Sequence, residues 1–315
     1  VVLAAASVGG LRMLFGTALK PAFAGQEMVY NMRPLLTASD AHSVKVTALG
    51  DEVEKPRGSV IDSIKRRGVL RVAVFAYRLP YVLVNRERSL VGLDVEMAQL
   101  LARDLGVKIE FVELEDPTLL PRLLANGRVD IAMAGIAVTP ERASEMLFSE
   151  PYLDETLAFI VKDHLREEFS TWANIRDLGS MRVKAPNLPY YIDQLKRRAP
   201  ELKLDLVESM SQIEAGMKQG AFDAIVLPAE SGSVLTLLYP KFTVVVPEPD
   251  VVKIPLAYPL ARRDQDWAHF INTWIELKRR GGTIQALYGH WILGKQENSR
   301  HPRWSILRNV LHWVD

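Results

Sequence analysis

The feature that most limits the fold is a regular alternation of short apolar runs with helical patterns. In the first half of the chain the expected elements are a strand at 69–75, a helix at 94–106, a strand at 107–113, a helix at 118–127 and a strand at 129–134. The helix at 94–106 keeps its apolar residues on one face, with Asp94 as its expected N-cap and Gly106 at its end. This order predicts a mostly parallel sheet covered by helices.

A second series of the same kind follows an apolar run at 155–161 and a polar stretch. Its expected strands and helices alternate at 181–185, 189–198, 202–207, 211–220, 222–227, 231–239 and 242–246. A strand at 254–260 and a helix at 266–280 come last. If these last elements pack on the first series, the chain crosses twice between two lobes, and a hinged ligand cleft lies between them. The expected fold class is therefore α/β, with two lobes and a hinged cleft.

The ends of the chain differ from this central part. Residues 1–20 form an apolar segment interrupted by Arg12, which we interpret as the end of a transmembrane helix; a signal peptide or a buried amphipathic helix would give a similar pattern. The expected divisions are a linker at 21–58, a folded domain at 59–294 with its first lobe at about 59–162 and 253–294 and its second at about 163–252, and a tail at 295–315. The apolar residues of the tail recur at helical spacing, which predicts a helix that docks either on its own domain or on a partner.

Composition excludes several classes of function. The 39 Lys and Arg residues almost balance the 38 Asp and Glu residues, so no overall field favours nucleic acid as a partner. The chain has no cysteine, which removes disulfides, thiolate metal sites and cysteine nucleophiles. Its 6 histidines are scattered without the paired spacing of metal ligands. We therefore expect neither a metal site nor a cofactor.

A set of short motifs points to a known family. They are GVLRV at 68–72, PY at 80–81, GLDVEM at 92–97, GRVD at 127–130, GIAVTPER at 135–142 and FSEPY at 148–152. In this order and spacing, over about residues 60–292, they resemble the bacterial extracellular solute-binding proteins of family 3. The resemblance implies a type II periplasmic-binding-protein fold, whose two lobes close on a small ligand.

The same resemblance implies a role for the motif that begins at Gly135. In this family the arginine of the T-x-E-R-like motif grips the carboxylate of the ligand, and that role carries over to Arg142. A guanidinium group matches a carboxylate with two parallel, charge-assisted hydrogen bonds. Thr139 could cap the following helix and offer its hydroxyl or amide to the same anion. The alternative is that Arg142 is a surface charge paired with Glu141 or Glu145.

Other expected ligand positions depart from the family pattern. In the second lobe Asn187 stands where members carry a small Gly-Thr or Gly-Ser pair, and Pro228 stands where an acidic residue meets the amino group of the ligand. Glu230 could replace that acid. In the first lobe Ala137 replaces a serine and Asp116 replaces a stacking aromatic residue. These departures predict a carboxylate-bearing ligand that need not be a standard amino acid.

The loop after the first strand supplies the remaining expected wall of the cleft. It contributes Tyr77, Arg78 and Tyr81, of which Tyr81 could equally belong to the core of its lobe. Together with Gly135, these residues complete the set of expected ligand contacts.

Three parts of the chain point to a narrower group within this family. These parts are PYY at 189–191, the segment at 246–258 and the C-terminal tail. They are similar to the solute-binding domain fused behind cation:dicarboxylate symporter-type membrane proteins. That arrangement implies that the domain delivers solute to a membrane transporter or regulates that transporter. The transporter would belong to the same polypeptide or be a separate protein. It also implies the bacterial inner membrane, with the binding domain on the periplasmic side. A sensory input domain of a membrane signalling protein is the alternative.

An enzyme is the other alternative. Ala229 and Glu230 resemble a local segment of the cyclohexadienyl dehydratases, which act on prephenate and arogenate, and a carboxyl in a dry cleft can act as a general acid. The Gly-Gly-Thr counterpart of those enzymes is missing at 187–189. We therefore expect a non-catalytic protein.

Overall fold

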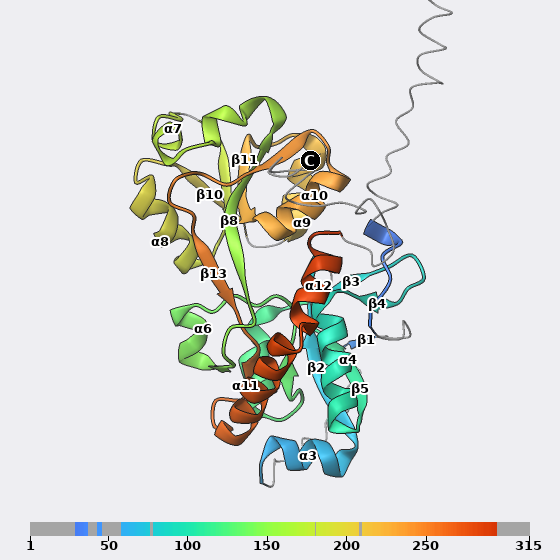
Figure 1. Ribbon diagram of the computed structural model, residues 1–315. Helices are drawn as coiled ribbons and strands as arrows, with labels where there is room; N and C mark the ends of the chain where they lie inside the picture. The colour runs from blue at the N-terminus through green and yellow to red at the C-terminus, as the bar shows by residue number, and fades with distance from the viewer. Residues whose placement is uncertain are drawn as a thin grey trace, which may run out of the picture.

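The computed structural model describes residues 29–36, 43–45, 58–75, 78–179, 181–207 and 210–294. Over this part the chain forms two lobes joined by two neighbouring strands (Figure 1). The segment at 1–20, the tail at 295–315, most of the linker and Tyr77 lie outside the described residues. No helix within the described ranges is long and apolar enough to span a membrane.

The first lobe is built on a parallel sheet of four strands. Across the sheet their order is β1 (Ser43–Lys45), β5 (Lys108–Glu113), β2 (Val69–Val74) and β6 (Ile131–Ala132). Its larger helices are α3 (Val60–Arg67), α4 (Leu93–Leu105), α11 (Gln265–Arg280) and α12 (Thr283–Trp291). Helix α4 packs on β2 and β5, and the late helices α11 and α12 return to α3 and α4. The last elements of the chain therefore pack on the first lobe.

Smaller elements complete this lobe. They are a hairpin of β3 (Leu83–Val84) and β4 (Leu90–Val91), a 3₁₀ turn η2 (Pro117–Leu119), α5 (Leu120–Ala125), α6 (Pro140–Glu145), β7 (Leu147–Phe148) and β14 (Pro259–Leu260). The single helix expected at 118–127 is divided into η2 and α5. Pro121 lies at the start of α5, where its missing N–H interrupts the hydrogen-bond series.

The second lobe is a mixed sheet with helices around it. Its strand order is β10 (Leu204–Val207), β9 (Val183–Pro186), β11 (Ala224–Pro228), β8 (Leu153–Lys162) and β12 (Phe242–Val245). Its helices are α7 (Trp172–Arg176), α8 (Pro189–Arg198), α9 (Met210–Gln219) and α10 (Ala229–Leu238), after the 3₁₀ turns η3 (Asp163–Leu165) and η4 (Glu167–Phe169). Strands β9, β10 and β11 are parallel, whereas β8 runs antiparallel to β11 and β12.

Strands β8 and β13 (Lys253–Leu256) make the connection between the lobes (Figure 1). The first part of β8, Leu153–Thr156, pairs with β13, and from Leu157 onward β8 pairs with β11 in the second lobe. The sequence places the end of the first lobe near residue 162, whereas β8 joins the second sheet several residues earlier. The strand expected at 254–260 is divided because β13 pairs with β8 and β14 pairs with β7.

A short N-terminal segment at 29–36 docks on the first lobe. The buried carboxylate of Glu96 in α4 accepts hydrogen bonds from the backbone N–H groups of Leu35 at 2.8 Å and Leu36 at 2.6 Å. It also accepts one from Trp291 Nε1 in α12 at 2.7 Å. One carboxylate therefore joins the segment, α4 and α12, and these hydrogen bonds offset the cost of burying its charge.

Candidate ligand-binding site

Arg142 lies on the short helix α6. Thr139 caps this helix by accepting a hydrogen bond from the backbone N–H of Arg142, and Pro140 occupies the first turn, as the sequence predicts. The guanidinium Nη1 donates to the carbonyl of Ala137 at 2.9 Å. Within the described residues no ion pair joins Arg142 to Glu141 or Glu145. Burial, then the charge of Arg78, lowers the pKa of this guanidinium.

Arg78 approaches the same place from the loop after β2. Its Nη2 donates to the carbonyl of Gly135 at 3.2 Å. Gly135 has a positive φ of 60°, and a Cβ there would lie 2.3 Å from the ring of Tyr81. Only glycine fits both demands. The loop from Gly135 to Ala137 therefore receives one arginine at each end, and it holds the two side chains within electrostatic range of each other.

Asp94 holds the loop from Gly135 to Ala137 in place from the protein interior. Its carboxylate is fully buried and accepts hydrogen bonds from the N–H of Gly135 at 2.6 Å, the hydroxyl of Tyr152 at 2.8 Å and the hydroxyl of Tyr258 at 3.2 Å. The two tyrosine rings are stacked, with centroids 4.3 Å apart. Burial raises the pKa of Asp94 to about 6, although its hydrogen bonds favour the charged form. The expectation that Asp94 caps α4 is wrong: Gly92 is the N-cap, and Asp94 has tertiary partners instead.

Two further carboxyl groups lie at the connection between the lobes. Glu155 on β8 is fully buried, and neither of its oxygens has a hydrogen-bond partner of ordinary geometry in the described part of the chain. Glu230, in the first turn of α10, accepts a hydrogen bond at 2.9 Å from the N–H of Thr156, the residue after Glu155. Burial raises the pKa of Glu155 to about 8, with Arg78 opposing the shift and Glu230 adding to it.

The second lobe closes over this group with α8 and α10. Tyr191 of α8 is buried; its burial, with the nearby charge of Glu155, raises the pKa of its hydroxyl, while Arg78 and Arg142 oppose that shift. Ser231 of α10 donates from Oγ to the carbonyl of Leu79 in the first lobe at 2.8 Å. The structure therefore has the lobes in contact across the cluster of Arg78, Arg142, Glu155, Tyr191 and Glu230, which we call the interlobe cluster.

The structure brings some of the predicted site residues together and leaves others apart. Gly135, Ala137 and Thr139 hold Arg142 and Arg78 in place, and Tyr81 is buried against Gly135. Asp116 lies on the surface, where it bonds the N–H and hydroxyl of Thr118 at the start of η2. Asn187 is exposed, and its N–H bonds the carbonyl of Val207.

Sequence reasoning missed Asp94, Glu155 and Tyr191. Each had a visible signal, because Asp94 and Tyr191 belong to the motifs at 92–97 and 189–191, and Glu155 is a carboxylate at the start of the apolar run at 155–161. Their partners lie far along the chain: Asp94 is separated by 41 residues from Gly135 and by 164 from Tyr258. Local spacing cannot identify such partners.

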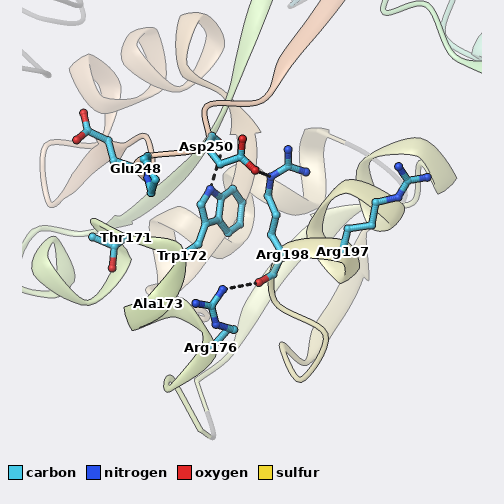
Figure 2. A pocket seen from close by; sticks show the side chains of 9 residues that line it. Thr171, Trp172, Ala173, Arg176, Arg197, Arg198, Glu248 and Asp250 are labelled. Carbon is cyan, nitrogen blue, oxygen red and sulfur yellow. Dashed lines mark hydrogen bonds and ion pairs between the residues drawn. The ribbon is translucent and has the colours of Figure 1, made fainter.

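A cavity of about 700 Å³ lies elsewhere, on the second lobe between α7 and the end of α8 (Figure 2). The side chain of Arg198 stacks on Trp172 and pairs with Asp250 at 3.2 Å, while Arg176 donates to the carbonyl of Arg198 at 3.1 Å. None of the predicted ligand residues lines this cavity. The described residues also contain no group of His, Cys, Asp and Glu arranged to hold a metal ion.

Comparison with known proteins agrees with this architecture. The chain is 30% identical over 237 residues to a cyclohexadienyl dehydratase of Pseudomonas aeruginosa, covering 74% of this chain and 86% of that protein. It is 23% identical over 228 residues to a putative arginine-binding protein of an ABC transporter in Escherichia coli, covering 71% and 90%.

Solved structures show the same fold. An ancestral amino acid-binding protein, described as a precursor of cyclohexadienyl dehydratase, aligns with a TM-score of 0.63 at 26% identity, over 75% of this chain and 100% of that one. A cysteine-binding protein from Campylobacter jejuni aligns with a TM-score of 0.64 at 20% identity, over 77% and 97%, and this shows the fold alone. Residues 70–294 match the model of one family, and the chain accordingly belongs to the bacterial extracellular solute-binding proteins, family 3.

Proposed function

We propose that this chain binds a small carboxylate-bearing solute between its lobes without transforming it, and that Arg142 and Arg78 hold the carboxylate. The observation that carries the proposal is the meeting of two guanidinium groups at the interlobe cluster. Among the described residues, each of the two donates a hydrogen bond only to a backbone carbonyl. A carboxylate between them would accept charge-assisted bonds from both and offset their mutual repulsion.

The solute class follows from the same chemistry. An amino acid or an organic or dicarboxylic acid supplies the required carboxylate. The named relatives that bind arginine or other amino acids support the amino-acid class. The exposed position of Asn187 and the proline at position 228 leave this site without the polar groups that the family resemblance leads one to expect, so the remaining contacts come from Glu155, Tyr191 and Glu230.

The biological setting is also part of this proposal. A two-lobed binder of this family would deliver its solute to a membrane transporter or regulate that transporter, in the same polypeptide or as a separate protein. The solute-binding domain would then face the periplasm at the bacterial inner membrane. A sensory domain would use the same site, because closure on ligand can drive either output.

A thermal-shift panel of amino acids and dicarboxylic acids tests the binding role. A ligand present at 100 times its Kd should stabilise the protein by about 2.7 kcal/mol. The Arg142→Ala variant should lose that stabilisation. Arg122→Ala, which removes an exposed arginine of α5, is the matched control and should retain it. A ligand that binds Arg142→Ala as tightly as the parent would disprove the clamp.

A lyase of the cyclohexadienyl dehydratase type is the second candidate. The 30% identity to such an enzyme and the buried carboxyl groups Glu155 and Glu230 favour it, because a protonated carboxyl in a dry site can donate to a leaving hydroxyl group. Prephenate would lose water and carbon dioxide to give phenylpyruvate. Steady phenylpyruvate formation that Glu230→Gln abolishes would establish catalysis, and its absence with prephenate bound would leave a binding protein.

A further inference from the structure

Glu155 is a buried carboxyl group at the connection between the lobes. Its side chain is fully buried on the strand that joins the lobes, and neither carboxyl oxygen has a hydrogen-bond partner of ordinary geometry in the described part of the chain. The hydroxyl of Tyr81 and the charge of Arg78 nevertheless lie close enough to lower the pKa of Glu155 in opposition to its burial. A buried charge in that position is costly because it is desolvated, and the Tyr81 hydroxyl and the Arg78 charge offset only part of that cost. A proton or a hydrogen-bond donor of a ligand could therefore satisfy the oxygens of this carboxyl group.

The groups that face Glu155 come from both lobes and from the connection between them. They are Arg78, Tyr81, Asp94, Tyr191, Glu230 and, acting through Glu230, Lys253 of β13. Tyr288 of α12 also lies within electrostatic range of Glu230. Asp94 already has three donors, and Lys253 donates to the hydroxyl of Thr156 at 2.7 Å. Each of these two groups therefore has other hydrogen-bond partners.

Arg78 is the charged group that acts most strongly on Glu155, and among the carboxyl groups Glu230 acts on it more strongly than Asp94 does. The carboxylate of Glu230 is held against the backbone N–H that follows Glu155, so two like charges would have to share one dry region. A pair of carboxyl groups in this arrangement retains one proton between them, because ionising both is opposed by repulsion and by the loss of water.

We propose that Glu155 and Glu230 share one proton in the ligand-free protein, and that an amino-bearing carboxylate displaces this proton when it binds at the interlobe cluster. The inference rests on the proposed function, since Arg78 and Arg142 take the carboxylate end. The ammonium end then meets Glu155, whose oxygens make no hydrogen bond of ordinary geometry in the described part of the chain. The bound cation replaces the proton, which passes to solvent, and the total charge of the pair and its cation is conserved.

Proton release fixes the sign of the pH dependence. The bound pair has a lower pKa than the free pair, so affinity rises with pH as long as the free pair holds its proton, and then levels off. The raised pKa of Glu155, about 8, places most of this rise below pH 8. Displacement of one proton gives up to about a tenfold gain in affinity per pH unit.

Calorimetric titration of the whole chain tests this directly. L-Arginine, L-glutamine and succinate serve as probes between pH 6 and 9, each in two buffers with different heats of ionisation, which count the protons exchanged. We expect about one proton released for an amino acid that binds and none for succinate, which lacks the ammonium group. Glu155→Gln, an uncharged mimic of the protonated side chain, should abolish the release and flatten the pH profile. Asp154→Asn, at the exposed neighbouring position on β8, should leave both unchanged.

An infrared measurement without ligand supports the titration. The parent at pH 7 should show the stretch of a protonated carboxyl group, and Glu155→Gln should show a clearly weaker one, because only the minor protonated fractions of groups such as Asp94 and Asp130 remain. An amino acid whose affinity depends on Arg142 but not on pH would overturn this inference and leave the carboxylate clamp standing. Binding that is independent of Arg142, or binding of none of the three probes, would overturn both. Equal pH profiles for succinate and an amino acid would overturn the exchange between ammonium and proton.

Discussion

Single residues hold the site in shape, and Asp94 does so with three hydrogen bonds. Its three hydrogen bonds join the Gly135 loop to Tyr152 and Tyr258 in a fully buried position. Removing a carboxylate of this kind leaves donors without partners, and each unsatisfied buried group costs roughly 1–3 kcal/mol. The residue therefore matters for the stability of the loop that places both arginines.

We predict that Asp94→Ala lowers the free energy of unfolding by about 3 kcal/mol or more, because an N–H and two hydroxyl groups lose their acceptor. Urea denaturation followed by circular dichroism measures this loss. Asp193→Ala, at an exposed position of α8, should change stability by less than about 0.5 kcal/mol. A loss at Asp94 no larger than that of the control would show that its network is not stabilising.

Gly135 allows a second test at this scale. Gly135→Ala places a Cβ 2.3 Å from the Tyr81 ring at a positive φ, whereas Gly106→Ala, at φ 70°, meets no atom within 4 Å. Both variants carry the backbone cost of about 1 kcal/mol, and only the first adds a collision. Gly135→Ala should therefore be clearly the less stable of the two in thermal unfolding. Equal losses would mean that the Tyr81 ring moves aside without cost.

At the scale of elements, the sequence predicts most of the fold because the apolar periodicity is strong. The helix at 189–198 coincides with α8, and the strands at 107–113 and 242–246 differ from β5 and β12 by a single residue. The failures occur where pairing partners decide the outcome. Residues 254–260 form one apolar run, but they become β13 and β14 because two different strands take up their hydrogen bonds.

The site was predictable to a smaller extent. Arg142, Thr139 and Gly135 follow from a local motif, since a cap and a turn are set by neighbouring residues. Glu155 lies on the strand that connects the lobes and Tyr191 lies on α8 of the second lobe, and only the tertiary fold brings these two distant positions of the chain within electrostatic range. The ligand role of Asp116 stays a prediction, because its position in an aligned motif says nothing about its local bond to Thr118.

Helix α10 carries a contact that favours closure. Ser231→Ala removes the hydrogen bond to Leu79 in the other lobe, worth about 1 kcal/mol, and should weaken solute affinity about fivefold by favouring separation of the lobes. Small-angle X-ray scattering should show a larger radius of gyration for the ligand-free variant. Ser233→Ala on the same helix loses only a hydrogen bond within α10, to the carbonyl of Ala229. This variant should retain the solute affinity and the radius of gyration of the parent.

At the scale of the whole molecule, buried carboxyl groups set the pH dependence of stability. Burial raises the pKa of Asp94 to about 6, of Asp130 to about 6 and of Glu155 to about 8. Groups whose pKa is raised by folding stabilise the native state fully below their unfolded values, and this contribution is lost as the pH rises through the folded values.

The protein without ligand should therefore lose stability between about pH 4.5 and pH 8, by at most about 1.4 kcal/mol per pH unit for each titrating group. Urea midpoints at pH 5, 7 and 9 measure the trend. Glu155→Gln cannot titrate, so its midpoint should fall less than that of the parent between pH 7 and 9. A parent protein that gains stability over this interval would contradict the assignment.

The docking of residues 29–36 on Glu96 has a mechanical consequence. Any chain that leads into this segment enters the molecule through α4 and α12, which belong to the first lobe. A separation of the lobes at β8 and β13 would therefore leave residues 29–36 fixed to the first lobe and would change only their distance from the second lobe.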